Sequence, residues 1–183
     1  MRKELPSFGA GLLVWTLLEY GIHDVLGHRP KGRTHASREH LRHHARTDYF
    51  TPYGQKALAA APVVTAAGVA ASLLVGPRRG AAFAAGLATG WAWYEVAHRW
   101  LHTRPPRTAY GRWLRRHHLH HHFGHPRRNH GVTTPLWDHV FRTHDRAAEI
   151  RVPRRNLPEL PWLTEINPPG GGQTPYSPEY RIV

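Results

Sequence analysis

The sequence predicts an all-α fold: an integral membrane helical bundle with a cytoplasmic, histidine-rich helical cap that holds a dimetal centre. Three observations predict it, namely long apolar segments with almost no charge, basic segments that follow them, and histidines clustered at helical spacing. The chain has 183 residues, of which 17 are histidine and none is cysteine. Disulfides, iron–sulfur clusters and thiol nucleophiles are therefore excluded, and any metal is held by nitrogen and oxygen ligands.

The first apolar segment, Phe8–Ile22, reads FGAGLLVWTLLEYGI and is interrupted only by Glu19. Together with Leu5 and the helical turn that follows, it reaches the roughly 20 residues that a membrane span needs. A cleaved signal peptide is the alternative, but no small-residue cleavage site follows the segment.

Two further apolar segments, Ala57–Gly76 and Ala81–Ala97, flank a tight turn at 76–80. The first carries no charge, has the length of a span, and is rich in the small residues typical of closely packed membrane helices. A buried helix of a soluble protein is the alternative. We expect a transmembrane hairpin here, and three spans in all, over about 6–27, 57–76 and 80–101.

Charge predicts both the kind of partner and the orientation. The formal net charge of +13 indicates an anionic partner, either nucleic acid or lipid headgroups. The mean hydropathy of −0.54 argues against a membrane protein, but the Arg and His that lower it are concentrated in a few segments. With three spans, the basic segments Arg29–Arg46 and Arg99–Arg155 share one side, which the positive-inside rule makes cytoplasmic. Arg78 and Arg79 lie on the other side and count against this orientation.

The domain organisation follows from composition. We expect residues 1–152 to form the membrane domain and residues 153–183 to form a Pro- and Gly-rich C-terminal tail. The tail ends in NPPGGGQTPYSPEYRIV, which is typical of an irregular, peripheral segment.

Four histidine clusters carry the predicted chemistry. They are HxxxxH at His23 and His28, HxxHH at His40, His43 and His44, HxxxH at His98 and His102, and HxxHH at His118, His121 and His122. On a helix, positions i, i+3 and i+4 lie within about 100° of arc, so each HxxHH helix should aim three imidazoles at one point. The HxxxxH pair diverges by about 140° on a regular helix, so we expect the helix to end, kink or bulge near Gly27.

Ten convergent imidazoles exceed what one metal ion can use, and they suit two ions with open positions for oxygen or water. Imidazole binds iron, zinc and copper alike, so the spacing does not name the metal. A generic histidine-rich tract is the alternative, but four ordered clusters argue against it. Carboxylates commonly orient metal-bound imidazoles. The candidates are Glu19, Asp24, Glu39, Glu95 and Asp138, of which Glu19 and Glu95 stand out because each lies in an apolar segment.

The order of these motifs resembles the fatty acid hydroxylase superfamily, also called the sterol desaturase family, from about Glu19 to His144. The most specific part is RHHLHHHF at 116–123, followed by RNHGVTTPLWDHVF at 128–141. These segments are similar to the family's final histidine box and its GVT-PLWD-xxF continuation.

The resemblance implies a membrane-bound, oxygen-dependent dimetal lipid hydroxylase that attacks a C–H bond of a fatty acyl chain or related lipid. The implied cofactors are two iron ions, with O2 as co-substrate, and zinc fits the same ligands in a purified sample. The implied partners are a lipid substrate from the bilayer, the membrane lipids, and an external electron donor of reductase, ferredoxin or cytochrome type, with no nucleic acid. The implied metal ligands are His23, His28, His40, His43, His44, His98, His102, His118, His121 and His122.

The chain also departs from the family pattern. An aromatic residue is more usual at position 130, where this chain has histidine. His139 and His144 are additional, and we read them as surface residues rather than ligands; His117 and His120 are extra residues beside the box. Against the family pattern, we expect one hairpin span before the first histidine box to be missing and no fused haem-binding donor domain, so that the electrons come from another protein.

Other functions remain open at this point. A sterol or carotenoid hydroxylase or desaturase and a non-enzymatic membrane metal-binding protein are the alternatives. A basic nucleic-acid binder leaves the hairpin unexplained.

Overall fold

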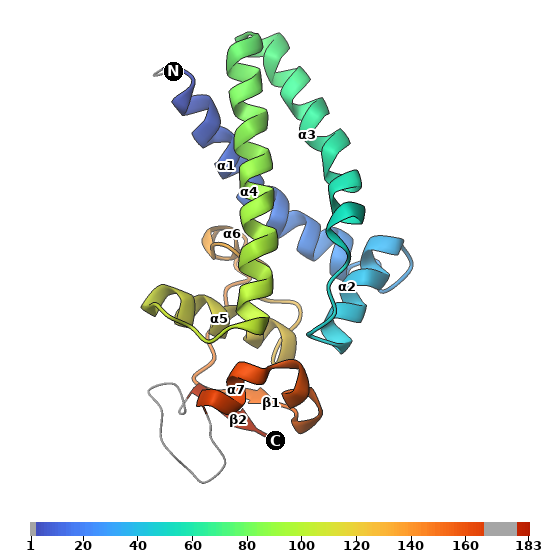
Figure 1. Cartoon of the computed structure of the whole chain (residues 1–183), viewed down its shortest axis with the longest axis vertical. Coiled ribbons are helices and arrows are strands. Elements are labelled where there is room, and N and C mark those ends of the chain that lie inside the picture. Colours follow the sequence, from blue (N-terminus) through green and yellow to red (C-terminus); the bar gives the residue numbers. More distant parts are fainter. Residues whose placement is uncertain (1–2, 167–178) are drawn as a thin grey trace. The chain divides into compact units, whose positions relative to one another are not determined.

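The computed structural model describes residues 3–166 and 179–183, and within these residues the fold is predominantly helical (Figure 1). Two short strands pair in parallel, with Ile150 opposite Tyr180. The predicted helical class is confirmed, with this small sheet added. The elements are α1 (Leu5–Gly21), the π-helical segment η1 (Ile22–His28), α2 (His35–Ala45), α3 (Tyr53–Val75), α4 (Pro77–Thr103), α5 (Ala109–Phe123), α6 (Leu136–Val140), β1 (Ile150–Val152), the 3-10 segment η2 (Arg154–Glu159), α7 (Pro161–Ile166) and β2 (Tyr180–Ile182).

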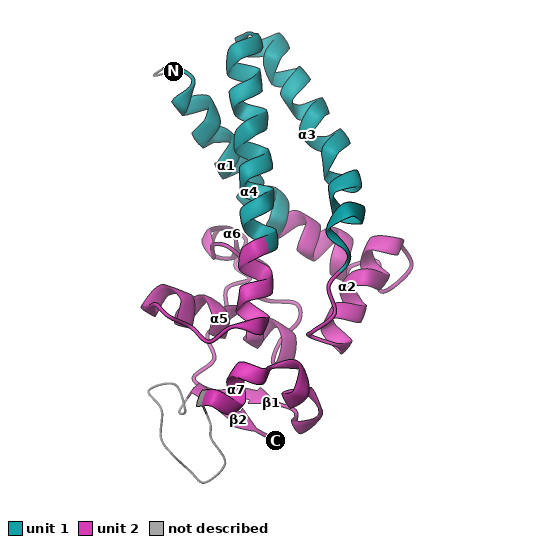
Figure 2. Cartoon of the chain, viewed as in Figure 1, with its two compact units in different colours: residues 1–19, 51–95 teal, residues 20–50, 96–183 magenta. Residues whose placement is uncertain are grey.

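The chain divides into two compact units (Figure 2). Unit 1 comprises residues 1–19 and 51–95, and it contains most of the apolar sequence. Unit 2 comprises residues 20–50 and 96–183, and it contains every histidine of the chain.

Glycines bring the helices of unit 1 into backbone contact. A Cβ at Gly11 of α1 would collide with the carbonyl oxygen of Phe83 in α4, and a Cβ at Gly86 would collide with that of Phe8 in α1. Close approach of this kind is how membrane helices associate, because lipid tails supply no hydrophobic driving force between them. The small residues of these segments therefore determine how α1 packs on α4.

Within residues 3–166 and 179–183, two helices are long and apolar enough to cross a membrane. They are α1 with its continuation to His28, with a mean hydropathy of 1.2, and α3, with a mean hydropathy of 2.1. Only 6% of the apolar window of α3 is buried, and Leu73 and Leu74 are 84% and 85% exposed, unlike the core helix of a soluble protein. The helix α4 covers the third expected span but falls short of the same apolar threshold, so that span stays a prediction.

The hydrophobic core of unit 2 is formed largely by residues of the C-terminal segment. Leu160, Trp162 and Leu163 are buried against Leu119 of α5, together with Ile150, Val152 and Tyr180 of the two strands. The expectation of an irregular, peripheral tail is therefore wrong for residues 153–166 and 179–183. Burying each large apolar side chain stabilises the fold by about 1.5–3 kcal/mol, which outweighs the Pro-rich composition. Residues 167–178, with the glycine run, lie outside the described residues.

Candidate metal centre

The ten predicted histidines gather in two groups within unit 2. In each group the candidate ligand atoms all lie within 4.8 Å of one another. The first group is His23, His28, His40, His44 and His121, and the second group is His43, His98, His102, His118 and His122. The structure thus brings together all ten residues, as two sets of five imidazoles.

Each HxxHH helix serves both groups. In α2, His40 and His44 join the first group while His43 joins the second; in α5, His118 and His122 join the second while His121 joins the first. The expectation that three imidazoles of one helix meet at one point is wrong. Positions i and i+4 are only about 40° apart and aim together, whereas position i+3 is about 60° away on the other side. That divergence lets one helix supply ligands to two neighbouring centres.

The π-helical segment η1 accounts for the unusual HxxxxH spacing. The wider turn of a π-helix brings positions i and i+5 toward one face, and the rings of His23 and His28 stack with centroids 5.4 Å apart. The irregularity expected near Gly27 is confirmed. Gly27 also has a packing role, because a Cβ there would lie 2.8 Å from Cδ2 of His40.

The Nε2 atoms of the first group converge at hydrogen-bond distance. His28 Nε2 lies 2.9 Å from His40 Nε2 and 3.0 Å from His121 Nε2, and the Nε2 atoms of His121 and His44 are 3.1 Å apart. A neutral imidazole has a single N–H, so these contacts cannot all be good hydrogen bonds. Nitrogens bound at about 2.1 Å on perpendicular axes of one ion would be about 3 Å apart. The spacing therefore fits a shared metal ion.

In three of the ten histidines, Nδ1, the ring nitrogen opposite Nε2, donates to a backbone carbonyl. Nδ1 of His23 donates to the carbonyl of His130 at 2.6 Å, Nδ1 of His43 to that of Tyr49 at 2.7 Å, and Nδ1 of His121 to that of Arg128 at 2.6 Å. These bonds place the proton on Nδ1 and leave the Nε2 lone pair available to a metal.

Some buried ring nitrogens have no hydrogen-bond partner among the described residues. They include Nε2 of His23, Nδ1 of His118 and both nitrogens of His122. Leaving a buried polar group unsatisfied costs about 1–3 kcal/mol, so a built site should offer these atoms a partner. A metal ion in each group would bind His23 and His122 through atoms that otherwise have none. The donor set therefore fits a pair of nitrogen-ligated ions.

Burial also keeps the imidazoles neutral. Desolvation, reinforced by the neighbouring histidines, lowers the pKa of His40, His44, His118, His121 and His122 well below the usual value of 6.5. Metal binding requires the neutral form of histidine. At neutral pH the site therefore needs no deprotonation before it binds an ion.

Comparison with known proteins shows the family to which a chain with this histidine arrangement belongs. The model of the fatty acid hydroxylase family matches residues 8–143, about three quarters of the chain. The chain belongs to the fatty acid hydroxylase family. The solved structure of full-length scs7p, of which only the hydroxylase domain is visible, superposes with a TM-score of 0.63 at 28% identity, covering 76% of this chain and 55% of that one.

The chain is similar in sequence to curated proteins that are named fatty acyl or fatty acid 2-hydroxylases. It is 32% identical to a dihydroceramide fatty acyl 2-hydroxylase of Arabidopsis thaliana, over 73% of this chain and 58% of that protein. It is also 32% identical to the fatty acid 2-hydroxylase of Homo sapiens, over 74% of this chain and 38% of that protein. The chain thus spans between about two fifths and three fifths of these relatives.

Two of the predicted carboxylates, Asp138 and Glu39, each bind a residue or segment whose backbone carbonyl accepts a hydrogen bond from a candidate metal ligand. Asp138 accepts hydrogen bonds from the backbone N–H of His130 at 2.7 Å and of Gly131 at 2.8 Å, and so holds the segment whose carbonyl receives His23. Glu39 accepts from the hydroxyl of Tyr49 at 2.5 Å, and the carbonyl of Tyr49 receives His43. Asp138 and Glu39 therefore hold in place the backbone carbonyls that orient His23 and His43.

Glu95 and Asp24 each pair with a basic residue, and Asp24 Oδ1 also lies 3.9 Å from Nε2 of the buried His130. Glu95 contacts Lys56 at 2.9 Å within unit 1. Asp24 pairs with Arg29.

The histidines near the final motif that are not predicted ligands lie outside the two five-histidine groups. His117 contacts Asp138 and His120 contacts Asp145, both outside the two groups. His139 is exposed and stacks on the half-buried His144, also outside both groups. His130, at the position where the family pattern usually has an aromatic residue, is only 2% exposed, and its ring centroid lies 5.3 Å from that of His121.

Sequence reasoning missed the residues of the C-terminal segment that hold the ligand-bearing helices. The indole N–H of Trp162 donates to the carbonyl of His102 at 2.6 Å. Arg115 stacks over Trp162 at 4.4 Å and donates to the carbonyl of Leu101. Glu159 accepts from the backbone N–H of Thr47, just after α2, at 2.8 Å. Trp162 and Glu159 lie beyond the part of the chain that matches the family model, so no family motif marks them.

Proposed function

We propose that this chain is a membrane-bound, oxygen-dependent hydroxylase that oxidises a C–H bond of a fatty acyl chain with the help of two iron ions. The observation that carries the proposal is the pair of five-histidine groups in a member of the fatty acid hydroxylase family. Relatives named dihydroceramide fatty acyl 2-hydroxylase and fatty acid 2-hydroxylase support a fatty acyl substrate and position 2 as the carbon attacked.

The first ion would be held by His23, His28, His40, His44 and His121, and the second by His43, His98, His102, His118 and His122. When bound, two redox-active ions supply the electron transfer to O2 that hydroxylation requires, which zinc cannot do. Overall, one C–H bond, O2, two electrons and two protons yield one C–OH and one water.

The protein's own residues supply the rest of the site. Backbone carbonyls of residues 49, 128 and 130 orient three imidazoles, so the ligands are positioned before a metal arrives. His102, His118 and His121 are fully buried, which keeps bulk water from the metals and protects reactive oxygen chemistry.

The setting of the site is part of the proposal. We assign residues 1–152 to the membrane domain, with spans near 6–27, 57–76 and 80–101, and the histidine groups to its cytoplasmic side. The substrate comes from the bilayer, and the two electrons come from a separate reductase, ferredoxin or cytochrome. The basic segments around the histidines support the cytoplasmic orientation.

Labelled oxygen tests the reaction. Detergent-purified protein is loaded with ferrous iron, supplied with ferredoxin and its reductase, and incubated under ¹⁸O2 in separate reactions with fatty acyl lipids, sterols and carotenoids. We expect a 2-hydroxy acyl product carrying one ¹⁸O atom, and none from His121→Ala, while His139→Ala behaves as wild type. A labelled product from sterols or carotenoids instead, or metal binding without any product, would overturn the proposal in favour of the corresponding alternative.

A further inference from the structure

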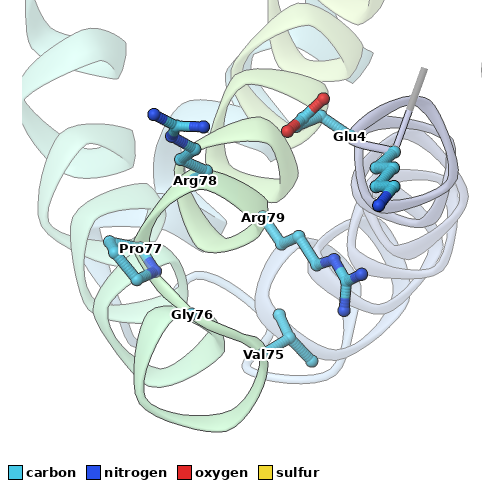
Figure 3. Close-up of a pocket in the computed structure, with 7 residues that line it drawn as sticks. Glu4, Val75, Gly76, Pro77, Arg78 and Arg79 are labelled. Atoms are coloured by element: carbon cyan, nitrogen blue, oxygen red, sulfur yellow. The ribbon is translucent and has the colours of Figure 1, made fainter. Parts of the chain in front are cut away.

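A hollow at the turn between α3 and α4 is not used by the metal chemistry. Its volume is about 310 Å³, and it lies entirely within unit 1 (Figure 3). The lining residues are Lys3, Glu4, Val75, Gly76, Pro77, Arg78 and Arg79. The hollow therefore gathers the two arginines that the positive-inside rule leaves unexplained, together with a lysine from the start of the chain.

The lining is positively charged. Lys3, Arg78 and Arg79 contribute three positive charges against the single carboxylate of Glu4. All three basic side chains are largely exposed, so their charges are available to a ligand from outside. Arginine matches phosphate with a planar fork of N–H donors, and lysine acts as a point charge.

The position along α3 places the hollow at the depth of lipid headgroups. The 23 residues of α3 rise about 34 Å at 1.5 Å each, close to the roughly 30 Å hydrocarbon thickness of a bilayer. No charged residue occurs in Ala57–Gly76, and Leu73 and Leu74 near its end are almost fully exposed. If acyl chains surround these leucines, Arg78 and Arg79 lie where the phosphates begin.

We propose that this hollow binds the phosphate of an anionic phospholipid headgroup, of the phosphatidylglycerol class. Arg78 and Arg79 bind the phosphate oxygens, Lys3 adds a third positive charge, and Val75 and Pro77 contact the apolar part next to the headgroup. The net positive lining favours anionic over zwitterionic lipids, because the latter bring a cationic amine with the phosphate. The apolar surface beside the hollow favours a lipid over free phosphate.

Lipid retention tests the site directly. The full chain is placed in nanodiscs of phosphatidylcholine with one quarter phosphatidylglycerol, and the lipids that remain bound are counted by native mass spectrometry. We expect enrichment of phosphatidylglycerol in wild type and a drop of about tenfold in that enrichment in R78Q/R79Q. The matched control is R154Q/R155Q, a second exposed Arg-Arg pair, which lies in unit 2 and should retain the enrichment.

Three results would overturn the proposal. Equal enrichment in R78Q/R79Q would show that the hollow is not the site. Equal loss in both double variants would indicate general charge attraction. Displacement of the lipid by millimolar inorganic phosphate would indicate a free-phosphate site. Metal content, measured on the same samples, checks the fold and keeps this test separate from that of the proposed reaction.

Discussion

The absence of a Cβ atom at Gly27 allows the first histidine group to form. Only a missing side chain lets the ring of His40 approach the π-helical segment, since a Cβ would lie 2.8 Å from that ring. We expect Gly27→Ala to displace His40 and to reduce bound metal to about one ion per chain, because the second group is untouched. Metal analysis of the purified variant checks this. Gly54→Ala is the control, since a Cβ at Gly54 meets nothing within 4 Å, and it should keep both ions.

Asp138 shows how an acid away from the metals supports them. Burial alone would raise the pKa of Asp138, but hydrogen bonds from His117, Gly131 and Thr143 outweigh it and lower the pKa below 3.8. Because the folded pKa is the lower one, the carboxylate stabilises the fold at neutral pH, and this contribution is lost as the pH falls below about 4.

Replacing Asp138 with Asn should therefore destabilise the protein in a pH-dependent way. The amide nitrogen of Asn would face N–H donors, at a cost of about 1–3 kcal/mol. Thermal unfolding should show a lower Tm for Asp138→Asn at pH 7, and the difference should shrink toward pH 3.5. A difference that is constant across this range would mean that the charge of Asp138 has no part in the effect.

Among the elements, helical spacing together with the family resemblance singled out the ten histidines that the structure gathers in two groups, and the HxxxxH spacing predicted the irregularity near Gly27. Helical spacing was not sufficient to predict how the histidines divide, because whether position i+3 aims with its neighbours or at a second centre depends on the facing helices. The carbonyls of Tyr49, Arg128 and His130 were also missed. Any residue has a carbonyl, so no residue type marks one that orients a histidine.

The C-terminal segment illustrates a different limit. Its Pro-rich composition suggested an irregular tail, whereas Leu160, Trp162 and Leu163 are buried to 1% exposure or less. Composition averages over a segment, but burial depends on a few large side chains that find an apolar surface, here that of α5.

Trp162→Phe isolates the hydrogen bond to the carbonyl of His102 from the packing of the ring. We expect a loss of about 1 kcal/mol in stability and weaker metal binding by the second group, because the carbonyl loses its donor. Chelator competition followed by metal analysis measures the affinity. Trp93→Phe, at a site that is 53% exposed, should leave both quantities unchanged. Equal metal affinity in the two variants would rule out a positioning role for Trp162.

At the scale of the whole molecule, charge and apolar patterning point to a membrane protein in spite of the low mean hydropathy. In the part of the chain that the structure describes, two helices have the length and composition of spans, and most of the apolar surface of α3 is exposed. We expect the protein to stay in the membrane fraction through washes with high salt and alkali and to dissolve only in detergent. Release by high salt alone would favour the interpretation as a basic nucleic-acid binder.

We expect the two separate five-histidine groups each to hold one metal ion. The most direct measurement is the metal content of detergent-extracted protein by mass spectrometry, for wild type, His43→Ala, His121→Ala and the control His139→Ala. We predict about two ions per chain in wild type and control, and about one in each of the other variants, because each removes a ligand from only one group. No bound metal in wild type, or an amount unaffected by both substitutions, would contradict it.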